Sequence, residues 1–146
     1  MPWPTPAELA DLVARFQACT LPKTEWTHAA HLAVGTWQVR QHGPERALDL
    51  LRTGISRLND AHGTVNDDVG GYHETITRAY VQLISEFLAP RPELATATCV
   101  QALLASALAA RDVLLDHYSK DTLMSVRARR SWLEPDRAPL CPSAAP

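Results

Sequence analysis

Apolar residues recur along most of the chain at the spacing expected for helices that are buried on one face. The clearest case begins at Thr5, which can cap a helix together with Glu8, while Pro6 takes the first helical position. The next apolar positions share one helical face: Leu9, Leu12, Val13 and Phe16. This pattern predicts a first helix whose inner face packs on a core.

A second helix is expected from about Thr24 to His42, where Gly43-Pro44 stops it. Between residues 29 and 37 this segment is apolar on nearly all sides. Such a composition is typical of a helix that neighbours cover on several sides. The second helix is therefore predicted to be central and buried.

Later segments continue the helical pattern. Helices are expected over 44–61 and 73–88, and the loop 63–72 joins them. The alanine- and leucine-rich stretch 94–118 can form one long helix or two. No alternation of apolar and polar residues is long enough to predict a strand.

The C-terminal part is expected to hold short helices capped by Ser119 and Ser125, which end before Pro135. Together these elements predict an all-α fold, a compact bundle of five to seven helices over residues 1–135. The Pro- and Ala-rich residues 136–146 are expected to form an irregular tail.

Composition and charge narrow the class of protein. The 146 residues are 46% hydrophobic, which suffices for one buried core, and the formal net charge of −2 argues against a dedicated nucleic-acid binder. The apolar runs are too short to span a membrane.

Cys19, Cys99 and Cys141 form no CxxC pair, which indicates reduced thiols and a cytoplasmic location. The self-association of the chain is left open, and a homo-oligomer is compatible with these features.

Two histidines near the start of the second helix are the strongest candidates for chemistry. His28 and His31 lie about 60° apart on one helix face, and Glu25 lies about 60° on the other side of His28. Glu-x-x-His is a recurrent metal-ligand spacing on bundle helices. His73, at the start of another helix, also faces inward. The alternative is that the histidines form ordinary hydrogen bonds in a polar corner of the core.

Three histidines at one end of a bundle predict a mononuclear site for a divalent metal ion. Three nitrogen ligands with an open coordination position are typical of catalytic zinc. If the Glu25 carboxylate replaces one histidine, the resulting set of two histidines and a carboxylate is typical of non-haem iron. Copper is the third candidate, since imidazole also suits that metal. His28, His31, His73 and Glu25 are thus the predicted metal ligands.

Other polar residues are candidates for catalysis and substrate binding. Glu74 is predicted as the general acid or base and Tyr72 as the group that orients the substrate. Arg129 is expected to hold an anionic group, and Tyr118 is a second candidate for substrate binding. The alternative for Glu74 is a surface ion pair with Arg78, four residues later.

Three blocks of the chain resemble those of a family of small, uncharacterised bacterial proteins. The blocks are Trp26–Leu32 (WTHAAHL), Gly71–Thr77 (GYHETIT) and the Ser125–Asp136 pattern SxxARxxWxxPD. This resemblance implies no particular reaction. A plan with three histidines in a helical bundle is also similar to that of DinB/YfiT-like metalloenzymes, although the order and spacing of the histidines differ.

Together these features predict a metal-dependent enzyme that acts on a small-molecule substrate, with hydrolytic, lyase and oxygenase chemistry all open. Two alternative functions are also compatible with the sequence. One is a non-catalytic protein in which the histidines and Tyr72 bind a small ligand in an apolar pocket. The other is a helical protein that binds a partner.

Overall fold

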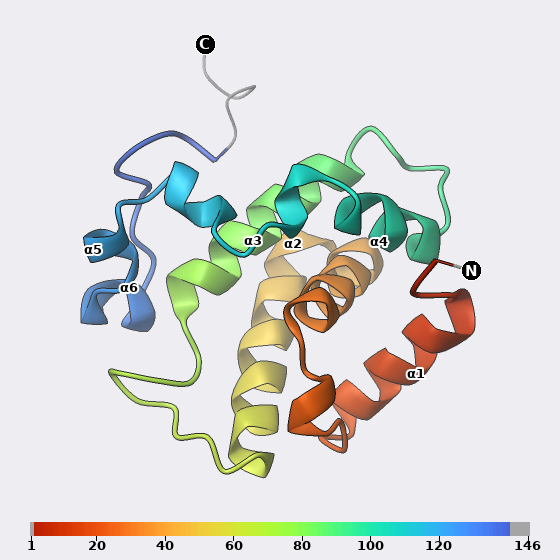
Figure 1. The fold of residues 1–146 in the computed structure, drawn as a ribbon, viewed down its shortest axis with the longest axis horizontal. Coiled ribbons are helices and arrows are strands. Elements are labelled where there is room, and N and C mark those ends of the chain that lie inside the picture. Colours follow the sequence, from red (N-terminus) through yellow and green to blue (C-terminus); the bar gives the residue numbers. More distant parts are fainter. Residues whose placement is uncertain (1, 141–146) are drawn as a thin grey trace.

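Helices account for all the regular secondary structure in residues 2–140, the part of the chain that the computed structural model describes (Figure 1). The α-helices are α1 (Pro6–Gln17), α2 (His28–Ala61), α3 (Glu74–Leu88), α4 (Thr96–Leu104), α5 (Lys120–Leu123) and α6 (Val126–Arg130). Short 3-10 turns are η1 (Lys23–Glu25), η2 (Ala107–Ala109) and η3 (Val113–Asp116). The prediction of an all-α bundle of five to seven helices is confirmed.

The long helix α2 is broken at Gly43, where the backbone leaves the helical region with φ 79° and ψ 164°. Pro44 comes directly after the break and has no N–H to donate to the preceding turn. The two predicted helices are therefore the two parts of α2, residues 28–42 and 44–61. The first part begins later than expected, at His28, because the Thr27 hydroxyl accepts the Ala30 N–H at 3.1 Å and caps the helix there.

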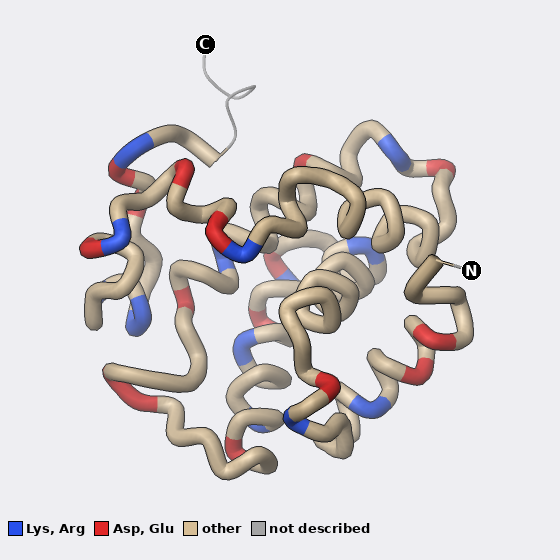
Figure 2. The backbone as a smooth tube through the Cα atoms, viewed as in Figure 1, with Lys and Arg blue, Asp and Glu red and all other residues tan. Residues whose placement is uncertain are grey.

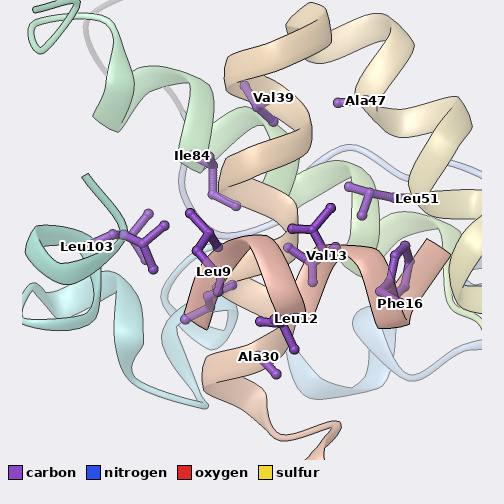
Figure 3. Packing of buried hydrophobic residues seen from close by; sticks show 14 of the residues in the cluster. Leu9, Leu12, Val13, Phe16, Ala30, Val39, Ala47, Leu51, Ile84 and Leu103 are labelled. Carbon is purple, nitrogen blue, oxygen red and sulfur yellow. The ribbon is translucent and has the colours of Figure 1, made fainter. Parts of the chain in front are cut away.

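The core lies where α1, α3 and α4 pack around α2 (Figure 1). Most of the first part of α2 is buried, which confirms its central position: Ala30, Leu32, Ala33, Val34, Gly35, Thr36, Gln38 and Val39. On α1 the four predicted apolar residues are all buried, and Figure 3 shows them beside Ala30 and Leu51 of α2. The periodicity of α1 and α2 thus identified the main core correctly.

Local capping sets the ends of several helices. The capping box of α1 is present, with the Thr5 hydroxyl accepting the Glu8 N–H at 3.2 Å and the Glu8 carboxylate accepting the Thr5 N–H at 3.0 Å. Ser119 and Ser125 cap α5 and α6 as predicted. The stretch 94–118 forms α4 and two 3-10 turns, because the extended backbone of Ser106 interrupts the helix.

Residues 136–140 are irregular, as expected, but they pack on the bundle. The Asp136 carboxylate accepts the Ser119 N–H and hydroxyl, both at 2.7 Å, and the Thr122 hydroxyl at 2.8 Å. Leu140 is buried in a second, smaller cluster with Tyr118. The remainder of the predicted tail, 141–146, lies outside the described residues. Among the described helices, none has the length and apolar character needed to cross a bilayer.

Candidate functional site

A cavity of about 380 Å³ lies between α2 and α3. Its walls are mainly aliphatic and come from both parts of α2 and from α3, including Leu32, Leu51, Ile55, Ile76 and Ile84. These side chains share the cavity because the break at Gly43 turns the second part of α2 away from the first, while α3 packs against both. Polar groups gather in the wall near the start of α2: Trp26, Thr27, His28, His31, Thr77, Tyr80 and Arg111.

His31 presents one ring nitrogen that the fold does not use. Its Nδ1 lies 2.7 Å from the Thr27 carbonyl oxygen, and a carbonyl only accepts, so Nδ1 carries the proton. Its ring stacks on Trp26 with the centroids 3.7 Å apart. Desolvation by the surrounding protein lowers the pKa of His31 to about 4. The residue nevertheless keeps part of its surface exposed to solvent. At neutral pH the Nε2 lone pair is thus free to accept a hydrogen bond.

His28 and Trp26 each bury a polar atom without a partner. The two atoms are His28 Nε2 and Trp26 Nε1, and neither has a hydrogen bond within the described chain. Burial lowers the pKa of His28, the nearby Arg111 cation lowers it further, and the Ala109 carbonyl partly opposes both effects. An unsatisfied buried group costs on the order of 1–3 kcal/mol. Both residues line the α2–α3 cavity.

His73 uses both ring nitrogens to hold the fold. Its Nδ1 accepts the Ile76 N–H at 3.1 Å as the cap of α3, so the proton is on Nε2, which donates to the Leu123 carbonyl at 2.7 Å. Burial lowers the pKa of His73, in keeping with this neutral form. The third predicted metal ligand therefore links α3 to the end of α5.

The predicted set of metal ligands does not come together in this geometry. Glu25 lies in η1 rather than on α2, and its carboxylate pairs with Arg15 at 3.1 Å. Within residues 2–140, no group of three or more His, Cys, Asp or Glu side chains is arranged to hold a metal ion. His28 and His31 share the wall of the α2–α3 cavity, and His31 and His73 share the wall of a neighbouring hollow of about 500 Å³. The mononuclear metal site stays a prediction.

Glu74 and Tyr72 belong to a polar cluster outside the apolar cavity. The Glu74 carboxylate binds the Arg52 guanidinium through two hydrogen bonds, of 2.9 and 2.7 Å, and accepts the Tyr72 hydroxyl at 2.7 Å. The Arg52 cation holds the pKa of Glu74 below its usual value, and burial raises the pKa of Tyr72. Arg78, the partner weighed for Glu74, instead lies over the Trp132 ring at 4.5 Å. In this arrangement Glu74 is a firmly ionised acceptor, and its role as a general acid or base stays a prediction.

Arg129 and Tyr118, the predicted substrate-binding residues, contact the backbone. Arg129 donates to the carbonyl oxygens of Gly71 and Tyr72 at 3.0 and 3.2 Å. Tyr118 is fully buried, and its hydroxyl donates to the Leu133 carbonyl at 2.7 Å. Arg129 thus holds the loop before α3, and Tyr118 anchors the C-terminal segment. Tyr118 lines none of the cavities described, whereas Arg129 borders the hollow that contains His73.

Trp26, Tyr80 and Arg111 are among the cavity-wall residues that the predicted site did not include. Trp26 belongs to the WTHAAHL block, so its position beside the histidines was a usable signal. Tyr80 shares the inward stripe of α3 with Ile76 and meets His28 edge to face, with centroids 6.0 Å apart. Arg111 comes from the connection between η2 and η3, far along the chain, and no local pattern indicated it.

Comparison of the chain with models of protein families, with curated proteins and with solved structures finds no match. The family resemblance carried by the three sequence blocks therefore stays a prediction. Figure 2 shows acidic and basic residues interspersed over most of the described fold, although the charged residues of the short helix α6 are all arginines. A function for this chain therefore has to be inferred from the geometry of the cavity and its polar wall.

Proposed function

We propose that this protein binds a small, mostly apolar molecule in the cavity between α2 and α3. The observation that carries the proposal is the free Nε2 of His31 at a cavity that is otherwise largely aliphatic. A volume of about 380 Å³ falls at the lower end of the range for small-molecule sites, roughly 300–1,000 Å³. A neutral imidazole whose other nitrogen is tied to a carbonyl has a fixed tautomer, and it accepts a hydrogen bond from a ligand hydroxyl or amide.

The neighbouring polar atoms support the same proposal. Trp26 Nε1 and His28 Nε2 are buried and unpartnered at the end of the cavity where His31 lies. A polar ligand group placed there gives them partners after a small rotation of their side chains. Binding then removes a cost that the free protein bears, and the aliphatic wall contributes the burial of apolar surface. The expected ligand has an apolar body and a hydroxyl at one end.

The test uses 1-octanol as the probe and isothermal titration calorimetry as the measurement. The wild-type chain should bind 1-octanol in a saturable manner, with one molecule per chain. His31→Phe keeps an aromatic ring beside Trp26 but removes the acceptor, so affinity should fall about ten-fold. Ile55→Phe places a larger side chain in the cavity and should abolish binding.

Leu50→Phe is the matched control, because Leu50 lies on the same part of α2 and lines none of the cavities described. It should bind 1-octanol as the wild type does. Unsaturable binding by the wild type, or equal binding by Ile55→Phe and Leu50→Phe, would exclude this cavity as the site.

A second proposed function is the metal-dependent enzyme that the histidine spacing predicts. The observation in its favour is that the His31 Nδ1–H is oriented by a backbone carbonyl while Nε2 stays free, an arrangement common among metal-binding histidines. His28 and His31 would hold the ion, and a bound cation would supply an activated water at neutral pH. His73 would join only by giving up its bond to Leu123.

Metal analysis of tag-free protein after exposure to zinc, iron and copper separates the two proposals. The enzyme proposal expects about one ion per chain, and loss of that ion in the variant with both His28→Ala and His31→Ala. A chain that binds 1-octanol but retains no stoichiometric metal supports the binding function alone.

A further inference from the structure

We infer that the ligand of the α2–α3 cavity carries an anionic oxygen group, a carboxylate in the first instance, and that Arg111 binds it at the opening of the cavity. The inference rests on the proposed binding function and narrows the class of ligand. The ligand is then a small organic acid with an apolar body, rather than a neutral alcohol or hydrocarbon.

Arg111 is the single permanent charge in the described wall of this cavity, whose other members are apolar, aromatic, hydroxyl or neutral imidazole groups. The residue is exposed, so its guanidinium meets solvent at the opening. No hydrogen bond or ion pair joins that guanidinium to any other residue of the described chain. The charge next to the cavity is therefore available to a ligand.

Three arginines of the described fold are engaged with carboxylates. Arg15 pairs with Asp11 and Glu25, Arg52 with Asp49 and Glu74, and Arg130 with Asp68. The chain thus offers acidic partners to exposed guanidinium groups in several places. Arg111 has no such acidic partner among the described residues, although it lines the α2–α3 cavity.

The surroundings of Arg111 favour an anion further. A neighbouring hollow of about 400 Å³ has Arg111, Lys120 and Asp112 in its wall, so two cations face one carboxylate there. His28 lines both this hollow and the apolar cavity, and the nearby Arg111 charge helps to keep its imidazole neutral. Asp112 is the one acidic residue among the described residues that line these two hollows, and Arg111 and Lys120 are the basic ones. An incoming carboxylate therefore meets a net positive charge.

The chemistry of guanidinium explains the choice of a carboxylate. Its planar, parallel N–H donors match the two oxygens of a carboxylate, and such charge-assisted hydrogen bonds are stronger than neutral ones. A phosphate monoester offers similar oxygens but a larger, tetrahedral head. In both cases the apolar body occupies the cavity, a hydroxyl meets His31 Nε2, and the anionic head stays at the opening with Arg111.

The test compares related ligands with and without a negative charge. The probes are 8-hydroxyoctanoate, its neutral methyl ester and 1-octanol, titrated into the full chain by calorimetry at neutral pH. The acid should bind about ten-fold more tightly than its ester, as expected for a charge-assisted hydrogen bond. Arg111→Gln should remove this preference, so that the acid and its ester bind with similar affinity.

Arg57→Gln is the matched control, since Arg57 is exposed and lines none of the cavities described. It should retain the full preference for the acid. 8-Hydroxyoctyl phosphate, which keeps the terminal hydroxyl, distinguishes the anionic heads. Weaker binding than the acid supports a carboxylate, and tighter binding overturns that assignment in favour of a phosphate.

Two failures are distinguishable. If 1-octanol binds but the acid gains nothing over its ester, or if Arg111→Gln keeps the gain, the role of Arg111 is overturned and the binding function stands. If neither the alcohol nor the acid binds, the proposed function itself fails.

Discussion

His73 shows how much one side chain contributes to this fold. It caps α3 through Nδ1 and reaches the Leu123 carbonyl through Nε2, and only the neutral ring with its proton on Nε2 can do both. The residue is 7% exposed, so both bonds lie largely away from solvent. Protonation would therefore break the cap as well as place a charge in the core.

At the residue scale, the neutral form of the partly buried histidines predicts that the free energy of unfolding depends on pH. The pKa values of His28, His31 and His73 are all lowered in the folded state, mainly by burial, so the unfolded chain takes up protons first as the pH falls. The stabilisation is complete above the ordinary histidine pKa of about 6.5 and is lost progressively toward the folded values, about 4 for His31. The free energy of unfolding, measured with urea, should thus fall between about pH 7 and pH 5.

His73→Asn checks the contribution of this residue. The asparagine oxygen can still cap α3, but the group does not titrate and the bond to Leu123 is lost. We expect the loss of stability over that pH range to become smaller than in the wild type. A variant that keeps the whole pH dependence of the wild type would assign the effect to other groups.

At the scale of elements, the loop before α3 depends on one glycine. Gly71 has φ 77°, and a Cβ there would lie 2.5 Å from the Asn66 side-chain oxygen and 2.6 Å from the Val65 carbonyl oxygen. Asn66 also accepts the Tyr72 N–H at 2.9 Å, so it cannot move away without losing a bond. Gly70 has no positive φ, and the nearest atom to its Cβ would be 3.8 Å away.

Gly71→Ala should therefore lower the free energy of unfolding by about 2 kcal/mol or more, from the left-handed backbone and the close contacts together. Gly70→Ala is the matched control and should change stability by less than about 0.5 kcal/mol. Thermal or urea denaturation of both variants measures the difference. Similar values for the two would mean that the turn does not need its left-handed residue.

At the scale of the whole molecule, the packing of α1 on α2 requires a close approach. A Cβ at Gly54 would lie 2.6 Å from the Phe16 ring, which is 1% exposed and belongs to the main core. Figure 3 shows Phe16 beside Leu51, one turn before Gly54 on α2. The ring has little room to withdraw, since it also contacts Trp26, with centroids 5.3 Å apart.

Gly54→Ala should lower the free energy of unfolding by about 1–3 kcal/mol, even though alanine gains about 1 kcal/mol in helix propensity. Thr53→Ala, at an exposed neighbouring position, is the control and should be neutral or slightly stabilising. Urea denaturation of both variants gives the comparison. A net gain in stability from Gly54→Ala would show that the two helices can separate without cost.

The sequence by itself determined the helices of this protein. The Thr5–Glu8 capping box, the Gly43-Pro44 break and the serine caps of α5 and α6 depend on residues within a few positions of one another. Local backbone hydrogen bonds and helical periodicity suffice to predict such features. The burial of the first part of α2 is predictable in the same way, because a segment that is apolar on all sides has to be covered.

Only the tertiary structure decided which polar groups meet. Glu74 binds Arg52, 22 residues earlier, rather than the neighbour on its own helix, and His73 binds a carbonyl 50 residues later. Arg111 reaches the α2–α3 cavity from a connection between two 3-10 turns. Helical periodicity tells which face of each helix turns inward, but not which residues of distant helices lie opposite one another. That pairing depends on how the helices cross, and it leaves Nε2 of His31 without a partner among the described residues while it occupies both nitrogens of His73.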